Sequence, residues 1–289
     1  MKNNSRIEVL VLRGTPKERG RVHGESLRPM IFEVLDRWKY QLGQQLRGDP
    51  DELVNEFVEG TGFISAVEKW TPHLLEEVEG IADGAGADFN DIFALQLMDE
   101  GGWYLQSLEQ RAGGRCSSLG CFREGDSPAI LAQNLDWSNY IEGLGVLFRI
   151  KHPGSKLESL VPTVAGVIGT CGLNNRPIGI CTNALWSHLN SSTEGLPVNF
   201  IVREVLEKLS LDAAIDFIHE IGHASGENYV MGDAEKVVDF ECSPRKVVQH
   251  IPYEGSRRVY HTNHPLVNDN LIFPSGRPPR IRLTTDSVT

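Results

Sequence analysis

The feature that most constrains the fold is a change of character near Gly113-Gly114. Before it, apolar residues recur at helical spacing; after it, short β-rich runs are separated by Gly, Pro, Asn and Asp. Two apolar helical stripes, within 198–209 and 211–221, interrupt the strand-rich part. Helices, then strands, then a helix pair, then strands predict an α+β fold of layered sheets covered by helices, rather than a strictly alternating βαβ fold.

The expected elements follow from local patterns. Residues 7–12 form a strand that Gly14-Thr15-Pro16 ends, and an apolar stripe from Ile31 to Leu46 indicates a long amphipathic helix. A further helix is expected to start at Thr71-Pro72 and to be stopped by Gly84 and Gly86, and another is expected from about Asp88 to Met98. The expected later strands are Ser117–Phe122, Ala129–Gln133, Gly145–Ile150, Val164–Thr170, Pro177–Thr182, Asn228–Met231, Val237–Phe240 and Lys246–His250.

Composition narrows the class of protein. The 28 Lys and Arg residues against 39 Asp and Glu residues give a net charge of -11, which argues against nucleic acid or an anionic membrane as partner. We find neither a membrane-length apolar window nor a secretory signal. Five cysteines are too few and odd-numbered for a disulfide framework. We therefore expect a cytoplasmic, reduced protein, in which one thiol could carry chemistry.

Cys116 is the first candidate for that chemistry. It follows a glycine loop and opens a strand, a position from which a thiol can be presented at the end of a sheet. Packing as a half-buried small apolar residue is the alternative. A nucleophilic cysteine needs an activating base, and the sequence forces no histidine beside Cys116.

Polar residues at strand ends are further candidates. Asp136 could orient a catalytic amine or bind a substrate amine, although a turn carboxylate that caps backbone N–H groups is the favoured interpretation. Asn183 also lies at a strand end, where amides commonly stabilise turns. In His261-Thr262-Asn263-His264, the two histidines lack a convincing third metal ligand, so no metal is expected. Asn263 is the better candidate there, as an amide donor to a developing oxyanion.

Three other patterns favour ordinary structural roles. Gly80 to Gly86 resembles a phosphate loop, but it follows a helix rather than a strand. Asp99 and Glu100 are neighbours on one helix and are expected to be solvated or capping rather than an acid–base pair. The arginines from Arg277 to Arg282 could receive a substrate carboxylate, although such a run is more often a solvated tail.

Six short segments occur in an order that matches one family. They are Gly14-Thr15-Pro16-x-Glu18-x-Gly20-x-x-His23-Gly24, Glu79-Gly80-Ile81-Ala82-x-Gly84, Cys116-Ser117-Ser118, Gln133-Asn134-x-Asp136, Asn183-Ala184-Leu185 and His261-Thr262-Asn263-His264. On these segments, which span most of residues 7–265, the chain resembles the isopenicillin-N acyltransferase (acyl-coenzyme A:6-aminopenicillanic acid acyltransferase) family of N-terminal nucleophile (Ntn) hydrolases.

The resemblance implies one Ntn-hydrolase domain, residues 1–289, built as a four-layer αββα sandwich with antiparallel sheets. It also implies a precursor cut between Arg115 and Cys116. The helix-rich fragment 1–115 and the strand-rich fragment 116–289 would stay associated. The cut frees the α-amino group of Cys116, which accepts protons near its usual pKa of ~7.7–8.0. Before cleavage that nitrogen is an amide and cannot act as a base, so processing would activate the enzyme.

The same resemblance implies roles for single residues. Cys116 would be the nucleophile of an amidohydrolase or acyltransferase that acts on a small linear N-acyl amide through a thioester. Asn263 would donate to the oxyanion, and Asp136 would hold the α-amino group or the substrate. The expected substrate-binding residues are Ser117, Asn134, Trp137, Asn183 and Arg280 (or Arg282). Acyl-coenzyme A or an acceptor amine could be a second reactant; no cofactor is expected, and a homo-oligomer stays open.

The chain departs from the family pattern in three places. Arg115 stands where the family usually has Gly, and the segment Leu95–Glu100 lacks an Asn and an Arg that relatives often carry. The sequence also ends where relatives continue into further strands, so a C-terminally truncated sequence is one alternative.

Two other functions stay open. One is an ordinary cysteine peptidase that pairs Cys116 or Cys121 with a histidine such as His261. The other is an unprocessed binding protein, or pseudo-enzyme, with the same fold.

Overall fold

The computed structural model describes residues 7–105 and 115–272. Helices dominate the first of these ranges and strands the second, as the sequence pattern predicts. None of the helices in the described ranges is long and apolar enough to cross a membrane. The elements of the first range are β1 (Glu8–Arg13), α1 (Pro16–Leu46), α2 (Pro50–Glu59), α3 (Phe63–Trp70), α4 (Pro72–Ala85), α5 (Phe89–Leu95) and α6 (Met98–Tyr104).

The Thr15-Pro16-x-Glu18 motif is the start of α1. The hydroxyl of Thr15 accepts a hydrogen bond from the Glu18 backbone, and the Glu18 carboxylate accepts one from the Thr15 backbone at 2.8 Å. This reciprocal pair satisfies backbone donors that a helix start leaves free, and Pro16 supplies a fixed helical φ. This part of the family motif therefore has a local structural role.

The paired glycines of α1 and α4 let these two helices approach closely. A Cβ atom on Gly20 would lie 1.9 Å from the carbonyl oxygen of Glu77, and one on Gly80 would lie 2.3 Å from a backbone oxygen of α1. Gly24 and Gly84 make the same kind of contact one turn further on. The glycines of the Gly80–Gly84 segment thus serve helix packing. This role explains why the segment is rich in glycine although it follows a helix and not a strand.

The second range supplies most of the strands. Its elements are β2 (Arg115–Cys121), β3 (Ile130–Asp136), η1 (Asn139–Ile141), β4 (Gly145–Lys151), β5 (Glu158–Val164), β6 (Gly172–Asn174), β7 (Gly179–Ala184), α7 (Val198–Val205), α8 (Leu211–Glu220), β8 (Glu227–Gly232), β9 (Val237–Ser243), β10 (Lys246–Gln249) and β11 (Arg258–His261). They form an eight-stranded sheet in the order β1-β4-β5-β6-β7-β8-β9-β10 and a three-stranded sheet in the order β11-β2-β3. All pairings are antiparallel except that of β1 with β4.

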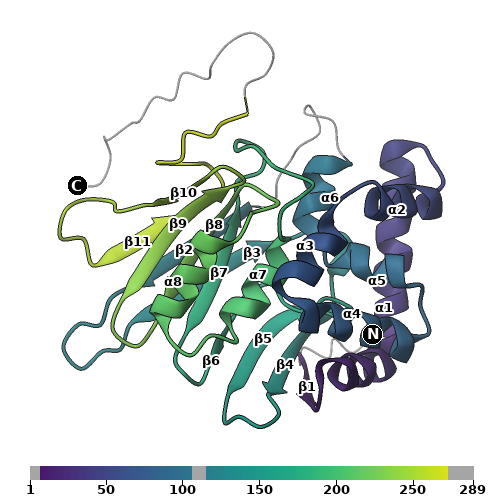
Figure 1. Ribbon diagram of the computed structural model, residues 1–289, viewed down its shortest axis with the longest axis horizontal. Helices are drawn as coiled ribbons and strands as arrows, with labels where there is room; N and C mark the ends of the chain where they lie inside the picture. The colour runs from purple at the N-terminus through teal and green to yellow at the C-terminus, as the bar shows by residue number, and fades with distance from the viewer. Residues whose placement is uncertain (1–6, 106–114, 273–289) are drawn as a thin grey trace.

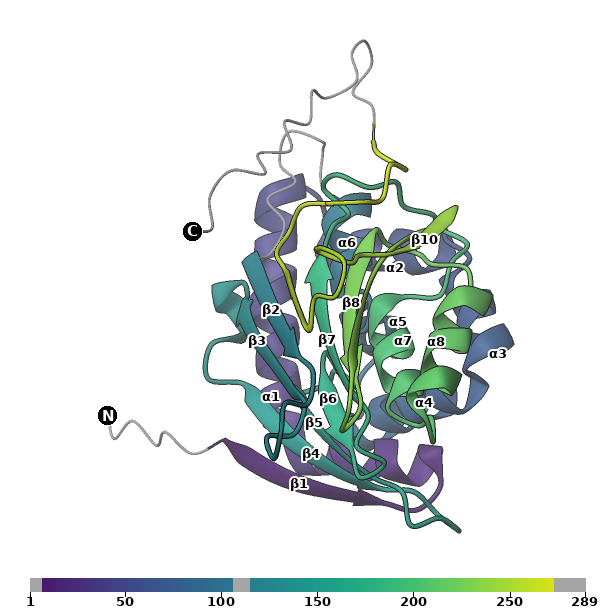
Figure 2. The ribbon, with the colours of Figure 1, turned by 90° about the vertical axis from the view of Figure 1, so that its left-hand side faces the viewer.

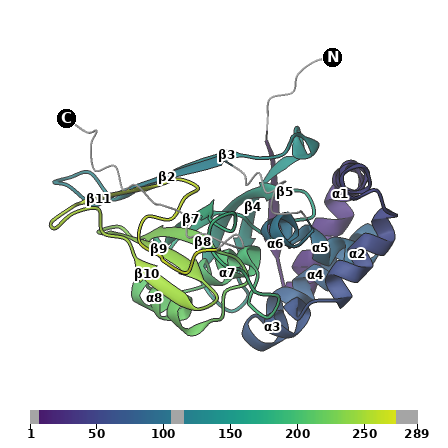
Figure 3. The ribbon, with the colours of Figure 1, turned by 90° about the horizontal axis from the view of Figure 1, so that it is seen from above.

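Figures 1 and 2 show the arrangement of these elements from two directions, and the layers are clearest in Figure 3, which shows the molecule from above. The three-stranded sheet packs on β7 and β8 of the large sheet, and α7 and α8 cover the opposite face. This arrangement confirms the α+β class with antiparallel sheets. The described residues contribute no helix to the outer face of the small sheet, where Leu119, Ile130 and Tyr260 are 41%, 51% and 56% exposed.

The expected strand Val164–Thr170 is wrong. Strand β5 ends at Val164, and the following residues form a buried turn in which Gly166 has φ +89°. The backbone N–H groups of this turn donate to side chains from the helical part of the chain, where a strand would donate to a neighbouring strand. His23 Nε2 accepts from the Gly166 N–H at 2.9 Å, and Gln96 Oε1 accepts from the Ile168 N–H at 2.9 Å. Apolar composition alone could not reveal these distant partners.

Candidate active site

Cys116 lies in β2 at one wall of a cavity of about 180 Å³. Its residue partner on β3 is Leu135, which lines the same cavity. Even-numbered β2 residues face the large sheet, so Cys116 is half-buried while Leu119, on the other face, is exposed. Strand alternation therefore turns this thiol inward, toward the space between the sheets and the helices.

Asn263 holds the backbone nitrogen of Cys116. Its Oδ1 accepts a hydrogen bond from that N–H at 2.5 Å, while its Nδ2 donates to the carbonyl oxygen of Ala184 at 3.1 Å. Ala184 ends β7 and lines the cavity. The structure thus brings together two predicted site residues that are 147 positions apart.

Glu241 anchors the loop that carries Asn263. This carboxylate on β9 accepts a hydrogen bond from His261 Nε2 at 2.9 Å. It also accepts three from backbone N–H groups of the loop, at Leu266 (2.5 Å), Val267 (3.1 Å) and Asn268 (2.6 Å). The sequence patterns did not indicate Glu241; its only signal is a charged residue inside an otherwise largely apolar strand.

His261 is fully engaged by its neighbours. Its Nε2 meets Glu241, and its Nδ1 lies 2.7 Å from the carbonyl oxygen of Thr262. No histidine is among the described residues that line the Cys116 cavity. A Cys–His pair at Cys116 therefore finds no support in this geometry.

Asp136 lies at the end of β3, beside the nucleophile candidate. Its strand partner is Arg115, and its backbone N–H interacts with the Cys116 thiol. The Asp136 side chain is exposed, and its negative charge contributes to a raised thiol pKa. The structure therefore places Asp136 next to the predicted cleavage bond, but not among the residues that line the cavity.

The predicted substrate-binding residues are not all at the cavity. Trp137 lines it, whereas Asn134 is exposed and donates to the Ser117 hydroxyl at 3.2 Å. Asn183 is fully buried, and its Oδ1 accepts from the Ser118 hydroxyl at 2.7 Å. Arg280 lies outside the described residues.

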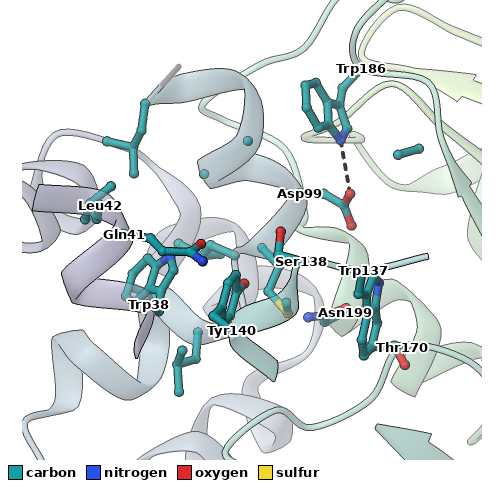
Figure 4. Close-up of a pocket in the computed structure, with 18 of the residues that line it drawn as sticks. Trp38, Gln41, Leu42, Asp99, Trp137, Ser138, Tyr140, Thr170, Trp186 and Asn199 are labelled. Atoms are coloured by element: carbon teal, nitrogen blue, oxygen red, sulfur yellow. Dashed lines mark hydrogen bonds between the residues drawn. The ribbon is translucent and has the colours of Figure 1, made fainter. Parts of the chain in front are cut away.

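The cavity contains two acidic residues: Glu227 of β8, which the sequence patterns did not indicate, and Asp99 of α6, which was expected to be solvated or capping and instead lines the cavity. Asp99 accepts a hydrogen bond from Trp186 Nε1 at 3.1 Å, which Figure 4 shows. Burial raises the pKa of Glu227 well above its usual value, and the charges of Asp99, Cys116 and Glu100 raise it further.

Glu100 was expected to be solvated or capping, and only the second interpretation is right. It is fully buried and accepts from the Val198 backbone N–H at the start of α7 and from the Ser225 hydroxyl. Burial, followed by the charge of Asp99, raises the pKa of Glu100 to about 8. Burial and then Asp99 also raise the pKa of Cys116 to about 11, so the thiol of the uncut chain is neutral at pH 7.

Comparison with known proteins identifies the family. The family model described as acyl-coenzyme A:6-aminopenicillanic acid acyl-transferase matches residues 122–275, more than half of the chain. The chain belongs to this acyltransferase family. The resemblance seen in the sequence motifs is thereby confirmed. The matched segment contains Asp136, Asn183 and Asn263 and begins just after Cys116.

Two individual proteins are also similar to this member of the acyltransferase family. Protein dcd1A of Dictyostelium discoideum is 27% identical over 247 residues, which cover 73% of this chain and 52% of that protein. The chain thus spans about half the length of that relative. Among solved structures, a variant of conjugated bile acid hydrolase from Clostridium perfringens aligns at 12% identity and TM-score 0.32, over 53% of this chain and 46% of that one.

Proposed function

We propose that this chain is a self-processing cysteine amidohydrolase or acyltransferase of the Ntn type. The observation that carries the proposal is the position of Cys116. The residue lines a cavity, and its backbone nitrogen donates to Asn263 Oδ1 at 2.5 Å. A nucleophilic sulfur and the nitrogen that would become its base therefore belong to one residue, held at one cavity wall.

Self-cleavage would use the same thiol. The Cys116 sulfur attacks the carbonyl carbon of Arg115, the C–N bond breaks as the C–S bond forms, and the thiol proton passes to the departing nitrogen. Water then hydrolyses this thioester, which leaves a carboxylate on Arg115 and restores the thiol. The new α-amine of Cys116 can accept a proton near neutral pH, which the former amide could not.

In each turnover the α-amine takes the proton of the Cys116 thiol as sulfur attacks the acyl carbonyl of an N-acyl amide. The amine proton then passes to the leaving nitrogen, and an acyl thioester remains. Water or an acceptor amine takes the acyl group from sulfur. A thiol whose pKa is about 11 in the uncut chain needs such a base, and a protonated amine beside it would lower that pKa.

Asn263 and Asp136 would assist this chemistry from opposite sides of Cys116. One hydrogen of Asn263 Nδ2 goes to Ala184, so the second is available to an oxyanion. The Asp136 carboxylate, beside the cleavage bond, would stabilise the positive charge of the freed amine. In the same proposal Trp137 contacts substrate directly, while Asn183 positions Ser118 behind the nucleophile.

A comparison of cysteine variants on a denaturing gel tests the proposal. Wild-type protein should separate into fragments of about 13 and 19 kDa, in proportion to the lengths of 1–115 and 116–289 within 32.1 kDa. Cys116→Ala should remain a single chain. Cys121→Ala is the matched control, because Cys121 lies at the far end of the same strand, and it should be cut normally.

Activity should follow the cut. Processed wild-type protein incubated with a panel of N-acyl amino acids, penicillins and β-alanyl amines should release an amine, and Cys116→Ala should release none. An active wild-type protein that stays uncut would contradict the mechanism and favour an ordinary cysteine peptidase. A fully cut protein that turns over none of the panel would favour a binding protein.

A further inference from the structure

Two free cysteines, Cys171 and Cys181, lie opposite each other on neighbouring segments of the large sheet. Strands β6 and β7 pair antiparallel and lie side by side in Figure 2, with Gly172 opposite Ile180. Cys171 comes directly before Gly172, and Cys181 directly after Ile180. Continuing the antiparallel register by one residue therefore places the two cysteines face to face.

Both cysteine side chains point to the same face of the large sheet. Residues directly opposite each other on antiparallel strands share a face. Cys181 belongs to a small apolar cluster against which Leu131 of β3 packs. A Cβ on Gly179, two residues earlier on β7, would lie 2.8 Å from the side chain of Leu131. The pair of thiols therefore lies on the face of the large sheet that is turned toward the small sheet.

The separation of opposite positions on antiparallel strands allows a disulfide, with some strain. Their Cα atoms lie about 4.5–5.5 Å apart, within the roughly 4.4–6.8 Å that a disulfide spans. Their Cβ atoms, also about 4.5–5.5 Å apart, are further from each other than the ~3.8 Å of a relaxed disulfide. Strained disulfides are the ones that are readily reduced again. A bond at this position should therefore form and break reversibly.

One thiol is accessible to reagents and the other is shielded. Cys171 is half-buried, whereas Cys181 is 6% exposed. Leu173 of β6, on the same face as Cys171, is 52% exposed, so solvent reaches this end of the pair. Burial raises the pKa of both thiols, that of Cys181 to about 12. A soluble oxidant should therefore reach Cys171 first, and mildly alkaline solution should supply more of the reactive thiolate.

Each of the two cysteines is next to a threonine of the cavity wall. Thr170 and Thr182 both line the cavity that contains Cys116. The Thr182 hydroxyl donates to the Thr170 carbonyl oxygen at 3.5 Å, which is long for a hydrogen bond. A covalent bond one residue away would hold these two segments together more firmly than this contact does.

We propose that Cys171 and Cys181 form a reversible disulfide when the protein meets a small-molecule disulfide, and that this bond stiffens the part of the cavity wall formed by Thr170 and Thr182. The pair acts independently of the nucleophile proposed above, because neither of its thiols takes part in amide cleavage.

The reaction is a two-step thiol–disulfide exchange. The Cys171 thiolate attacks one sulfur of the small disulfide, whose S–S bond breaks and releases one small thiolate. The Cys181 thiolate then attacks the Cys171 sulfur of this mixed disulfide and releases the second small thiolate. The protein thus loses two electrons and two protons, and both are recovered in the two small thiols.

Peptide mapping of the whole protein tests the disulfide. The protein is incubated with glutathione disulfide at mildly alkaline pH, freed of reagent, alkylated with iodoacetamide while unfolded and digested with trypsin. The tryptic peptide 157–203 contains Cys171 and Cys181 as its only cysteines, since trypsin does not cut the Arg176–Pro177 bond. It should appear unalkylated and two hydrogens lighter, and dithiothreitol should restore alkylation at both residues. A treated peptide that is alkylated at both cysteines would overturn the proposal.

Single variants test the order of the two steps. Cys181→Ser lacks the resolving thiol, so it should stop at a mixed disulfide between glutathione and Cys171. Cys171→Ser should keep Cys181 reduced, because that thiol is shielded. Cys121→Ala is the matched control and should form the internal disulfide as wild type does. A wild-type protein that keeps glutathione on Cys171 while Cys181 stays free would overturn the pairing without any need for a variant.

Amide hydrogen exchange tests the effect on the cavity wall. Segment 170–182 should exchange more slowly in oxidised than in reduced wild-type protein, while helix α8 should be unchanged. Cys171→Ser treated in the same way should show no difference in segment 170–182. Equal exchange in a protein whose disulfide has been verified by mass would overturn the stiffening of the wall. None of these measurements needs amide turnover, so their failure and the failure of the proposed function are distinguishable.

Discussion

Removing the negative charge of Glu241 should loosen the loop that holds Asn263. The Glu241 carboxylate accepts four hydrogen bonds, two at each oxygen, from one histidine and three loop N–H groups. Glu241→Gln keeps the size of the side chain but leaves only one accepting oxygen. Its amide NH₂ would then face two N–H donors and could accept neither.

The magnitude follows from those bonds. A hydrogen bond to a charged group contributes about 1.5–3 kcal/mol, and two such bonds are lost. Some relaxation of the loop reduces the total, so we expect a loss of about 2–4 kcal/mol in the free energy of unfolding. For a protein of this size that corresponds to a fall in Tm of roughly 5–10 °C.

Two assays test this variant. Thermal unfolding by circular dichroism gives the change in Tm. The rate of appearance of the two fragments, measured where the variant is still folded, should fall at least tenfold because Asn263 no longer holds the Cys116 nitrogen. Glu254→Gln is the control and should match wild type in both. A Glu241→Gln protein with wild-type Tm and cleavage rate would refute the role of Glu241 as anchor.

Three further outcomes follow. Asn263→Ala removes the acceptor for the Cys116 nitrogen and the proposed oxyanion donor, so cleavage on a gel should slow by roughly 10²–10³-fold. Gly84→Ala places a Cβ 2.2 Å from a backbone oxygen of α1 and should lower Tm by several degrees. Burial lowers the pKa of His261, but its hydrogen bond to Glu241, the charge of Asp239 and the Thr262 carbonyl together outweigh this, so the net pKa is raised above its usual value of 6.5. The pair therefore contributes fully below pH 6.5 and less as pH rises through the raised pKa, so Tm should fall with rising pH more in wild type than in His261→Gln.

Each of these three predictions has a control variant or a result that would contradict it. Gly101→Ala, in α6, meets no atom closer than 3.8 Å and should not lower Tm as Gly84→Ala does. Rapid cleavage of a folded Asn263→Ala protein would contradict the role of that amide. Parallel Tm profiles of wild type and His261→Gln from pH 6 to 9 would contradict the titration of the His261–Glu241 pair.

Local patterns predict the elements whose stabilising contacts are local. The stripe from Ile31 to Leu46 became α1, and Gly86, which adopts φ +67°, ends α4 where the glycines predicted a stop. The short helices α2, α3 and α6 and the strands β5, β6 and β11 were not predicted. The turn after Val164 was taken for a strand because the side chains that satisfy its backbone come from the helical part, up to 143 residues away.

The candidate site, like the fold, contains some residues that sequence patterns predict and others that only distant contacts bring together. The motif order pointed to Cys116, Asp136 and Asn263, and the structure brings the backbones of Cys116 and Asp136 and the Asn263 amide to one place. No spacing rule could join Asp99 to Glu227, because one lies on a helix and the other on a strand in the second half of the chain. The acidic cavity is a product of tertiary packing, and only the assembled fold reveals it.

The most direct measurement of the central claim is N-terminal sequencing of the purified protein together with its intact mass. Self-processing at Arg115–Cys116 predicts a new N-terminus that reads Cys116-Ser117-Ser118 and fragments of about 13 and 19 kDa, in proportion to their lengths within 32.1 kDa. The Cys116→Ala variant should give one uncut mass. A catalytically active wild-type chain of full mass, or a cut at any other bond that leaves Cys116 internal, would contradict the claim.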